Sequence, residues 1–232
     1  RLIPTLGVKQ AVIDIHIAKE EYDAAVDALT DLLATDPSNT DARLQLAVVL
    51  ANMREYERAA AVARWAAAAR PNETMAHEIA AEAFMSIGRP EDAIMHYRAI
   101  LQLDPENERV GSKMAYAYYQ FGEYGRAVLQ LKRLIEQGAQ DSIVYYHLTL
   151  CYAKQMLTDH VVLTLQNSTK RFGQEIVRAW IQGPEFDPFR DDPQFQMFLK
   201  QLARGPRRDR VTMEQRQARR KALRGRIPGD RL

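Results

Sequence analysis

Hydrophobic residues recur at spacings of three and four along most of this chain, and short polar segments interrupt them at regular intervals. Between residues 108 and 137 this spacing predicts two amphipathic helices, over 108–121 and 124–137. Gly122 and Gly125 fall where the two helices meet, and we expect both glycines to make the turn. The pattern therefore predicts a helical hairpin.

The same pattern returns with a strict period. Pro37, Pro71 and Pro105 lie 34 residues apart, and alanine occupies one equivalent position at 25, 59, 93 and 127. Tyrosine occupies another at 22, 56 and 124, where the third unit has Pro90. A small alanine lets two helices approach closely, and we expect each closing proline to start the next helix. Stacked hairpins of this kind bury one continuous core.

A period of 34 residues that carries a small residue, glycine, tyrosine, alanine and a closing proline resembles the tetratricopeptide repeat. The resemblance covers residues 7–37, 40–71, 74–105, 108–138 and, in a more degraded form, 142–169. It implies an all-α fold, a right-handed superhelical solenoid of stacked helical hairpins. The family's usual tryptophan early in the first helix is absent, and its place is taken by Arg43, His77, Gly111 and Tyr145.

Three parts follow from this organisation. We expect a repeat array over 1–171, capping helices over 172–204, and a basic tail over 205–232 with a short helix. An apolar segment at 175–181, a loop and an apolar helix at 194–203 are similar to the closing element of bacterial repeat proteins. Four phenylalanines are expected to cover the last hairpin there: Phe186, Phe189, Phe195 and Phe198. A separate binding module is the alternative.

The charge of the chain is unevenly distributed. Residues 203–232 hold 11 Lys and Arg against 3 Asp and Glu, a net charge of +8, so an overall charge of +2 leaves the first 202 residues at −6. The tail can bind the phosphates of nucleic acid, bind an acidic protein or membrane surface, or fold back on the acidic body. Its candidate residues are Arg207, Arg208, Arg216, Arg219, Arg220, Lys221 and Arg224.

Membrane and compartment signals are sparse. No apolar run approaches the roughly 18 residues that a membrane helix needs. The chain begins with Arg1 and not with methionine, so an upstream signal or anchor stays open, with a cytoplasmic location slightly favoured.

The compact catalytic motifs of hydrolases, phosphate-binding loops and zinc proteases are absent from the sequence. His147 and Cys151 lie four residues apart on one predicted helix and form the nearest approach to a reactive pair. A buried thiol beside a helix-surface histidine is the preferred interpretation. The other histidines are assigned to separate repeats, and no metal or cofactor is expected.

The resemblance also implies a concave groove lined by the first helix of each hairpin. Its predicted lining residues are Leu44, Val48, Met75, Glu78, Glu82, Met85, Arg109, Tyr116, Tyr119, Tyr146 and Leu150. Members that clamp the acidic end of a chaperone carry Lys and Asn at several of these positions, so this clamp is disfavoured here. The lining favours a peptide with apolar anchors and a basic residue, since Glu78 and Glu82 lie near its centre. Alternatively, these three tyrosines pack on one another or on the ends of the chain itself.

These features favour a non-enzymatic scaffold or adaptor that holds a partner peptide or helix within a larger assembly. The alternative is a nucleic-acid or ribonucleoprotein-associated factor that binds through its basic tail, and an enzyme using His147 and Cys151 is a third hypothesis. The sequence does not name the partner, because one fold hosts many functions.

Overall fold

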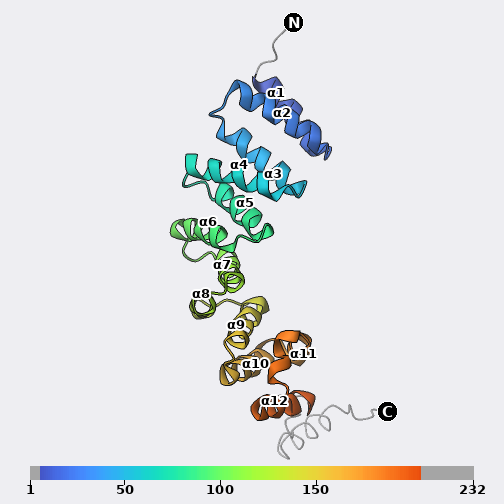
Figure 1. Ribbon diagram of the computed structural model, residues 1–232, viewed down its shortest axis with the longest axis vertical. Coiled ribbons are helices and arrows are strands. Elements are labelled where there is room, and N and C mark those ends of the chain that lie inside the picture. The colour runs from blue at the N-terminus through green and yellow to red at the C-terminus, as the bar shows by residue number, and fades with distance from the viewer. Residues whose placement is uncertain (1–5, 205–232) are drawn as a thin grey trace, which may run out of the picture. The chain divides into compact units, whose positions relative to one another are not determined.

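The computed structural model describes residues 6–204, and the basic-tail prediction at 205–232 lies outside them. The chain divides into two compact units, residues 1–157 and 158–232, each described by itself. The described part of the first unit contains these helices in order (Figure 1): α1 Leu6–Ala18, α2 Tyr22–Thr35, α3 Thr40–Asn52, α4 Tyr56–Ala69, α5 Thr74–Ser86, α6 Pro90–Leu103, α7 Glu108–Phe121, α8 Tyr124–Glu136 and α9 Ser142–Lys154.

Consecutive helices of the first unit pack against one another, so that α1–α2, α3–α4, α5–α6 and α7–α8 form four stacked hairpins. The predicted hairpin at 108–137 is confirmed, with its second helix ending one residue early at Glu136. The repeated alanines Ala25, Ala59, Ala93 and Ala127 are fully buried. Because an alanine adds little volume, the helices of each hairpin can approach closely at that point.

The turn of each of the four hairpins, and the turn that follows α9, contain one residue in the left-handed backbone conformation. These residues are 34 apart, with φ between 56° and 83°: Glu20, Arg54, Gly88, Gly122 and Met156. At Gly122 the next backbone N–H, that of Glu123, donates to the Tyr118 carbonyl at 2.9 Å and closes the end of α7. Gly125 was expected in this turn, but it lies in the first turn of α8. The turn therefore depends on one position per repeat.

The loops between hairpins prepare the start of the next first helix. Asn39, Asn107 and Asp141 each accept a backbone N–H from the helix that they precede, at 2.9, 3.1 and 2.9 Å. These side chains satisfy donors that a helix start leaves free. The expectation that the closing prolines start the helices is wrong, because Pro37, for example, lies two residues before the capping Asn39.

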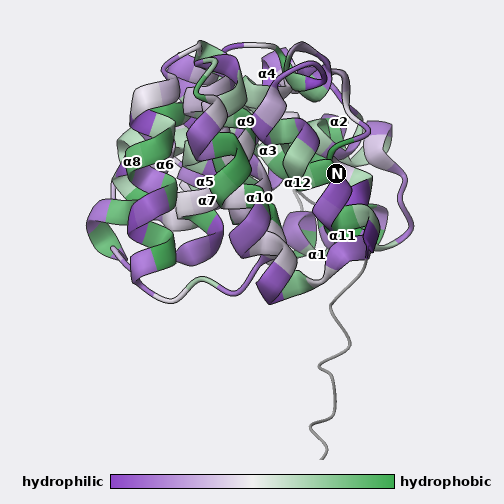
Figure 2. Cartoon of the chain, turned by 90° about the horizontal axis from the view of Figure 1, so that it is seen from below, coloured by the Kyte–Doolittle hydropathy of each residue, from purple (hydrophilic) through white to green (hydrophobic). Residues whose placement is uncertain are grey.

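Every helix of the first unit mixes hydrophobic and hydrophilic residues along its length, as Figure 2 shows. The apolar residues meet between neighbouring helices, and the core includes Ile13, Leu29, Leu50, Val110 and Leu131. None of the described helices is both long and apolar enough to cross a bilayer.

The described part of the second unit contains α10 Thr158–Phe172, α11 Gln174–Trp180, the short 3-10 helix η1 Pro184–Phe189 and α12 Pro193–Arg204. Helices α11 and α12 both pack on α10. The segment predicted as a loop contains η1, because its two phenylalanines turn inward and are buried. Phe195 packs on three other rings, with centroids 6.1 to 6.4 Å away: Phe186, Phe189 and Phe198. The predicted division at residue 171 stays a prediction.

Candidate functional site

The first helices of the hairpins, α1, α3, α5 and α7, and helix α9 present one recurring arrangement of side chains, which we call the first-helix face. Two positions four residues apart on one helix are matched by a third position on the next first helix, 35 and 31 residues further along. The repeat places four such sets in order: Gln10, Asp14 and Gln45; Leu44, Val48 and Ile79; Glu78, Glu82 and Lys113; Ser112, Tyr116 and His147. The period supplies the positions, and each set has its own chemistry.

The first set is joined by amide hydrogen bonds. Gln10 Nε2 donates to Gln45 Oε1 at 2.9 Å and to Asp14 Oδ1 at 2.9 Å, and Gln45 Nε2 lies 3.5 Å from the same Asp14 oxygen. The second set is apolar and half-buried. These two sets lie on α1, α3 and α5.

The third set is ionic. Lys113 bridges Glu78 and Glu82, with its Nζ 3.1 Å from Glu78 Oε1, and Arg109 forms a bidentate pair with Glu78. The hydrogen bond from Arg109, helped by Lys113, lowers the pKa of Glu78 to about 2 in spite of the opposing effect of burial. The charges of Glu78 and Glu82 are therefore compensated within the protein. The sequence predicts a basic residue of the ligand beside these two carboxylates, but their pairing with Arg109 and Lys113 was not foreseen.

The fourth set is aromatic. The rings of Tyr116 and His147 are stacked with centroids 5.1 Å apart, and Tyr119 stacks beside Tyr116 at 6.2 Å. Tyr119 in turn contacts Tyr124 of α8, with centroids 5.6 Å apart. Tyr116 is 37% exposed, so the cluster is both packed internally and open at one side. Packing of Tyr116 on Tyr119, which the alternative interpretation expected, is therefore observed, and a groove-lining role for the tyrosines stays a prediction.

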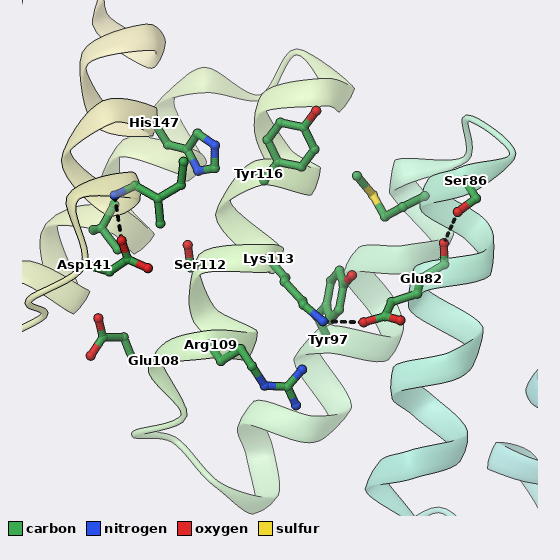
Figure 3. A pocket seen from close by; sticks show the side chains of 13 residues that line it. Glu82, Ser86, Tyr97, Glu108, Arg109, Ser112, Lys113, Tyr116, Asp141 and His147 are labelled. Atoms are coloured by element: carbon green, nitrogen blue, oxygen red, sulfur yellow. Dashed lines mark hydrogen bonds and ion pairs between the residues drawn. The ribbon is translucent and has the colours of Figure 1, made fainter. Parts of the chain in front are cut away.

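A cavity of about 810 Å³, which we call the central cavity, opens between α5, α7 and α9 (Figure 3). One side carries the ionic set, with Lys113 reaching Glu82, and Tyr97 of α6 lies behind this pair. The stacked Tyr116 and His147 form another side, and Met85, which lines a neighbouring pocket together with Tyr116, adds apolar surface to the cavity.

Two further carboxylates, Glu108 and Asp141, line the remaining side of the central cavity. Asp141 caps α9, accepting the Ile143 N–H at 2.9 Å. Neither carboxylate forms an ion pair with a residue of 6–204. Both carboxylates thus lie at helix N-termini, and neither has a cationic side-chain partner among the described residues.

A second cavity of about 510 Å³, the N-terminal cavity, lies on the same face between α1, α3 and α5. Its apolar lining includes Ile17, Leu44, Val48 and Met75. Asp14 and Asp41 lie at its polar edge, and Asp41 pairs with Arg70, whose hydrogen bond lowers the pKa of Asp41.

Most of the predicted groove residues fall on these cavities. Leu44, Val48 and Met75 line the N-terminal cavity. The central cavity receives four others: Glu82, Met85, Arg109 and Tyr116. Glu78 lies beside it through its ion pairs, and Tyr119 through its stacking. Tyr146 is half-buried, with its ring centroid 6.0 Å from that of His147, while Leu150 is buried.

The prediction missed Lys113 and His147, which complete the ionic and aromatic sets. The signal was present in the sequence, because opposite charges at separations of 31 and 35 residues face each other when first helices are neighbours. A search within single units does not reveal such pairs.

The proposed reactive pair lacks the features of an activated thiol. Cys151 is fully buried, and burial raises the pKa of its thiol to about 12, so the thiol stays protonated at neutral pH. The expected buried thiol is confirmed. His147 differs from the expected surface residue: it is half-buried, burial lowers its pKa, and its Nδ1 has no hydrogen-bond partner within 6–204.

His77 and His96 correct another expectation, because they belong to the same hairpin and not to separate repeats. Their Nδ1 atoms lie 3.0 Å apart in the core between α5 and α6, and His77 Nε2 lies 3.1 Å from the Pro71 carbonyl. Burial, followed by the neighbouring His77, lowers the pKa of His96 to about 4. Within residues 6–204 there is no cluster of three or more ligating side chains that could hold a metal ion.

All seven basic-tail candidates lie outside the described residues: Arg207, Arg208, Arg216, Arg219, Arg220, Lys221 and Arg224. Binding of nucleic acid or of an acidic partner by the tail therefore stays a prediction from the sequence.

Comparison with solved structures shows the shared fold. The crystal structure of MamA protein matches with a TM-score of 0.66 at 18% identity, over 73% of this chain and 93% of that chain. The structure titled "MamA 41-end from Desulfovibrio magneticus RS-1" matches with a TM-score of 0.61 at 16% identity, over 80% and 96%. YrrB, described as a TPR protein with an unusual peptide-binding site, matches with a TM-score of 0.64 at 14% identity, over 73% and 88%.

No curated protein matches the sequence significantly. Family models of the tetratricopeptide repeat match residues 13–62, 44–108 and 85–149, which together span more than half of the chain. Since the period, the stacked hairpins and these matches agree, the chain belongs to the tetratricopeptide repeat family.

Proposed function

We propose that this protein is a non-enzymatic scaffold whose first-helix face holds a peptide or helix of a partner protein. The observation that carries the proposal is the succession of two cavities on one face, each lined by side chains from three first helices or their equivalents. Exposed apolar and aromatic side chains next to paired charges are typical of protein-binding surfaces.

Two further observations support the proposal. YrrB, which shares the fold, is described as having a peptide-binding site. The nearest candidate for a nucleophile, Cys151, is buried and protonated at neutral pH, which speaks against a thiolate mechanism.

Affinity capture from the native extract, with identification by mass spectrometry, tests the scaffold function. The wild type is compared with Tyr116→Ala combined with Val48→Arg, which alters both cavities at half-buried or exposed positions. Leu129→Ala is the matched control, because Leu129 is a large side chain that is 71% exposed and lines neither cavity.

We expect partners that the wild type and Leu129→Ala retain and that the double variant loses. Capture that is identical for all three proteins would count against the first-helix face. A nuclease-treated sample distinguishes the scaffold function from the alternative, nucleic-acid binding. Partners that disappear with nuclease or with modest added salt would point to an electrostatic nucleic-acid contact.

A further inference from the structure

We infer that the central and N-terminal cavities hold a single extended peptide of the partner, with a basic side chain in the first and a large apolar side chain in the second. The inference rests on the proposed function and specifies the chemistry of its ligand. It is carried by the charges around the central cavity, the lining of the N-terminal cavity and the distance between the two.

The central cavity favours a cation because its carboxylates outnumber its cations. Arg109 and Lys113 are already engaged by Glu78 and Glu82. Glu108 and Asp141 remain without a cationic partner among the residues of 6–204. A lysine or arginine of the ligand would supply the missing charge, whereas an acidic side chain would meet repulsion from both carboxylates.

The aromatic stack directs the rest of the ligand. The Tyr116 ring already packs against two rings of the protein, those of His147 and Tyr119, with centroids 5.1 and 6.2 Å away. Together with Met85, these rings offer apolar surface to the methylene stem of the basic side chain, since long basic side chains bury their stems along apolar surface. The charged head then lies on the side of Glu108 and Asp141, opposite the Lys113–Glu82 pair (Figure 3).

The N-terminal cavity suits an apolar anchor. Ile17, Leu44, Val48 and Met75 supply its lining, and Met75 is 54% exposed. Of the two carboxylates at its polar edge, Asp41 is paired with Arg70, and Asp14 accepts hydrogen bonds from the amides of Gln10 and Gln45. A large aliphatic or aromatic side chain can displace water there without breaking an ion pair.

The separation of the cavities fits one extended chain. The N-terminal cavity is centred near α3 and the central cavity near α7, two first-helix steps away. Packed helices lie about 8–10 Å apart, so two steps amount to about 20 Å. An extended chain advances about 3.3 Å per residue, which places the two anchors about six residues apart.

The test uses a displayed library of random 16-residue peptides, selected on the full chain. Selected peptides are synthesised with a fluorescent label, and their dissociation constants are measured by anisotropy at fixed salt. We expect enriched peptides to carry an Arg or Lys about six residues from a large apolar residue. Replacing that basic residue by Glu should weaken binding at least tenfold, and inserting three residues between the anchors should weaken it similarly.

Protein variants identify the contacts. Glu108→Gln combined with Asp141→Asn keeps the size of both side chains and the capacity of residue 141 to cap α9, and it should weaken binding several-fold. Val48→Arg should weaken the same peptides by obstructing the other anchor. Glu91→Gln is the control, because it removes an exposed carboxylate from α6 that lines neither cavity.

The outcomes separate the inference from the function that it specifies. Peptides that lose affinity for Val48→Arg and Tyr116→Ala but contain no basic residue, or bind the Glu108 and Asp141 variant normally, would overturn the inference and leave the scaffold function standing. A library without enriched peptides, or peptides that bind every variant like the wild type, would overturn both.

Discussion

At the scale of single residues, equivalent positions adopt the same backbone conformation whatever residue occupies them. Glu20 and Arg54 in hairpin turns, and Met156 after α9, take the left-handed conformation that Gly88 and Gly122 take at the equivalent positions. A residue with a side chain pays roughly 1–2 kcal/mol for this conformation, whereas glycine does not. The turn therefore imposes the left-handed backbone conformation, and the residue type changes only the free energy that this conformation costs.

Two glycines three residues apart should respond in opposite directions to the same substitution. Gly122→Ala is expected to lower the free energy of unfolding by about 1 kcal/mol, because φ is 83° there. Gly125→Ala should raise it by about 0.5 kcal/mol, since Gly125 lies in the first turn of α8 with open space at its Cβ. Urea unfolding followed by circular dichroism measures both, and equal effects would contradict the assignment of the turn.

Helix α5 lacks the cap that its equivalents have. Glu73 has the extended backbone of Asn39 and Asn107 but no side-chain hydrogen bond to the helix. Glu73→Asn should therefore stabilise the protein by about 1 kcal/mol, and Asn107→Ala should destabilise it by a similar amount. Thermal and urea unfolding of both variants provide the comparison, and a Glu73→Asn protein that is less stable than wild type would argue against this.

At the scale of the helix, equivalent faces differ in what covers them. Val8, Val12 and Ile15 of α1 are 52%, 42% and 51% exposed. The residues at the same positions of α3, α5, α7 and α9 are all buried: Ala42, Leu46 and Val49; Ala76, Ala80 and Ala83; Val110, Met114 and Ala117; Val144, Leu148 and Cys151. Those helices each pack against the second helix of the preceding hairpin, which α1 does not have among residues 6–204.

The same substitution at two equivalent valines measures this difference. Val110→Ala removes a side chain that is 1% exposed and should cost about 2 kcal/mol of unfolding free energy. Val8→Ala should change stability by no more than about 0.5 kcal/mol. Both valines are third in their helices, so helix propensity affects them alike. Equal losses in urea unfolding would show that the α1 face is covered in solution.

Packing within the α5–α6 hairpin should make the stability of the protein depend on pH. The pKa of His96 is lowered to about 4 by burial and then by His77, with Asp92 and Arg64 acting in opposite directions. Because the unfolded chain then binds more protons than the folded one, stability present above pH 6.5 is lost as the pH falls toward 4, by up to about 1.4 kcal/mol per pH unit. His96→Gln should flatten this slope in urea unfolding at pH 7, 6 and 5, and an unchanged slope would assign it to other groups.

The helices could be predicted from the sequence, but most side-chain contacts between helices could not. The period of Pro37, Pro71 and Pro105 and the alanines at 25, 59, 93 and 127 predict the hairpins because backbone packing repeats. The ion pairs of Lys113 and the contact of His77 with His96 depend on which positions face each other across helices. That information appears in the sequence only after the register between helices is known.

At the scale of the molecule, the hairpins repeat the same backbone arrangement, while the side chains of the first-helix face differ from one repeat to the next. The four sets on the first-helix face use equivalent positions, yet they are amide, apolar, ionic and aromatic in turn. Changes at these positions leave the buried alanines and the turns untouched. Under the proposed function, binding specificity and folding would therefore depend on different residues of the same repeat.

The exposed face of α1 has a consequence for engineering. Its three apolar side chains have the spacing that elsewhere receives the second helix of a hairpin. An additional hairpin joined ahead of α1 through an Asp-Pro-Ser-Asn linker, as between α2 and α3, would find its contact surface already present. A hairpin added ahead of α1 would therefore extend the first-helix face by one step.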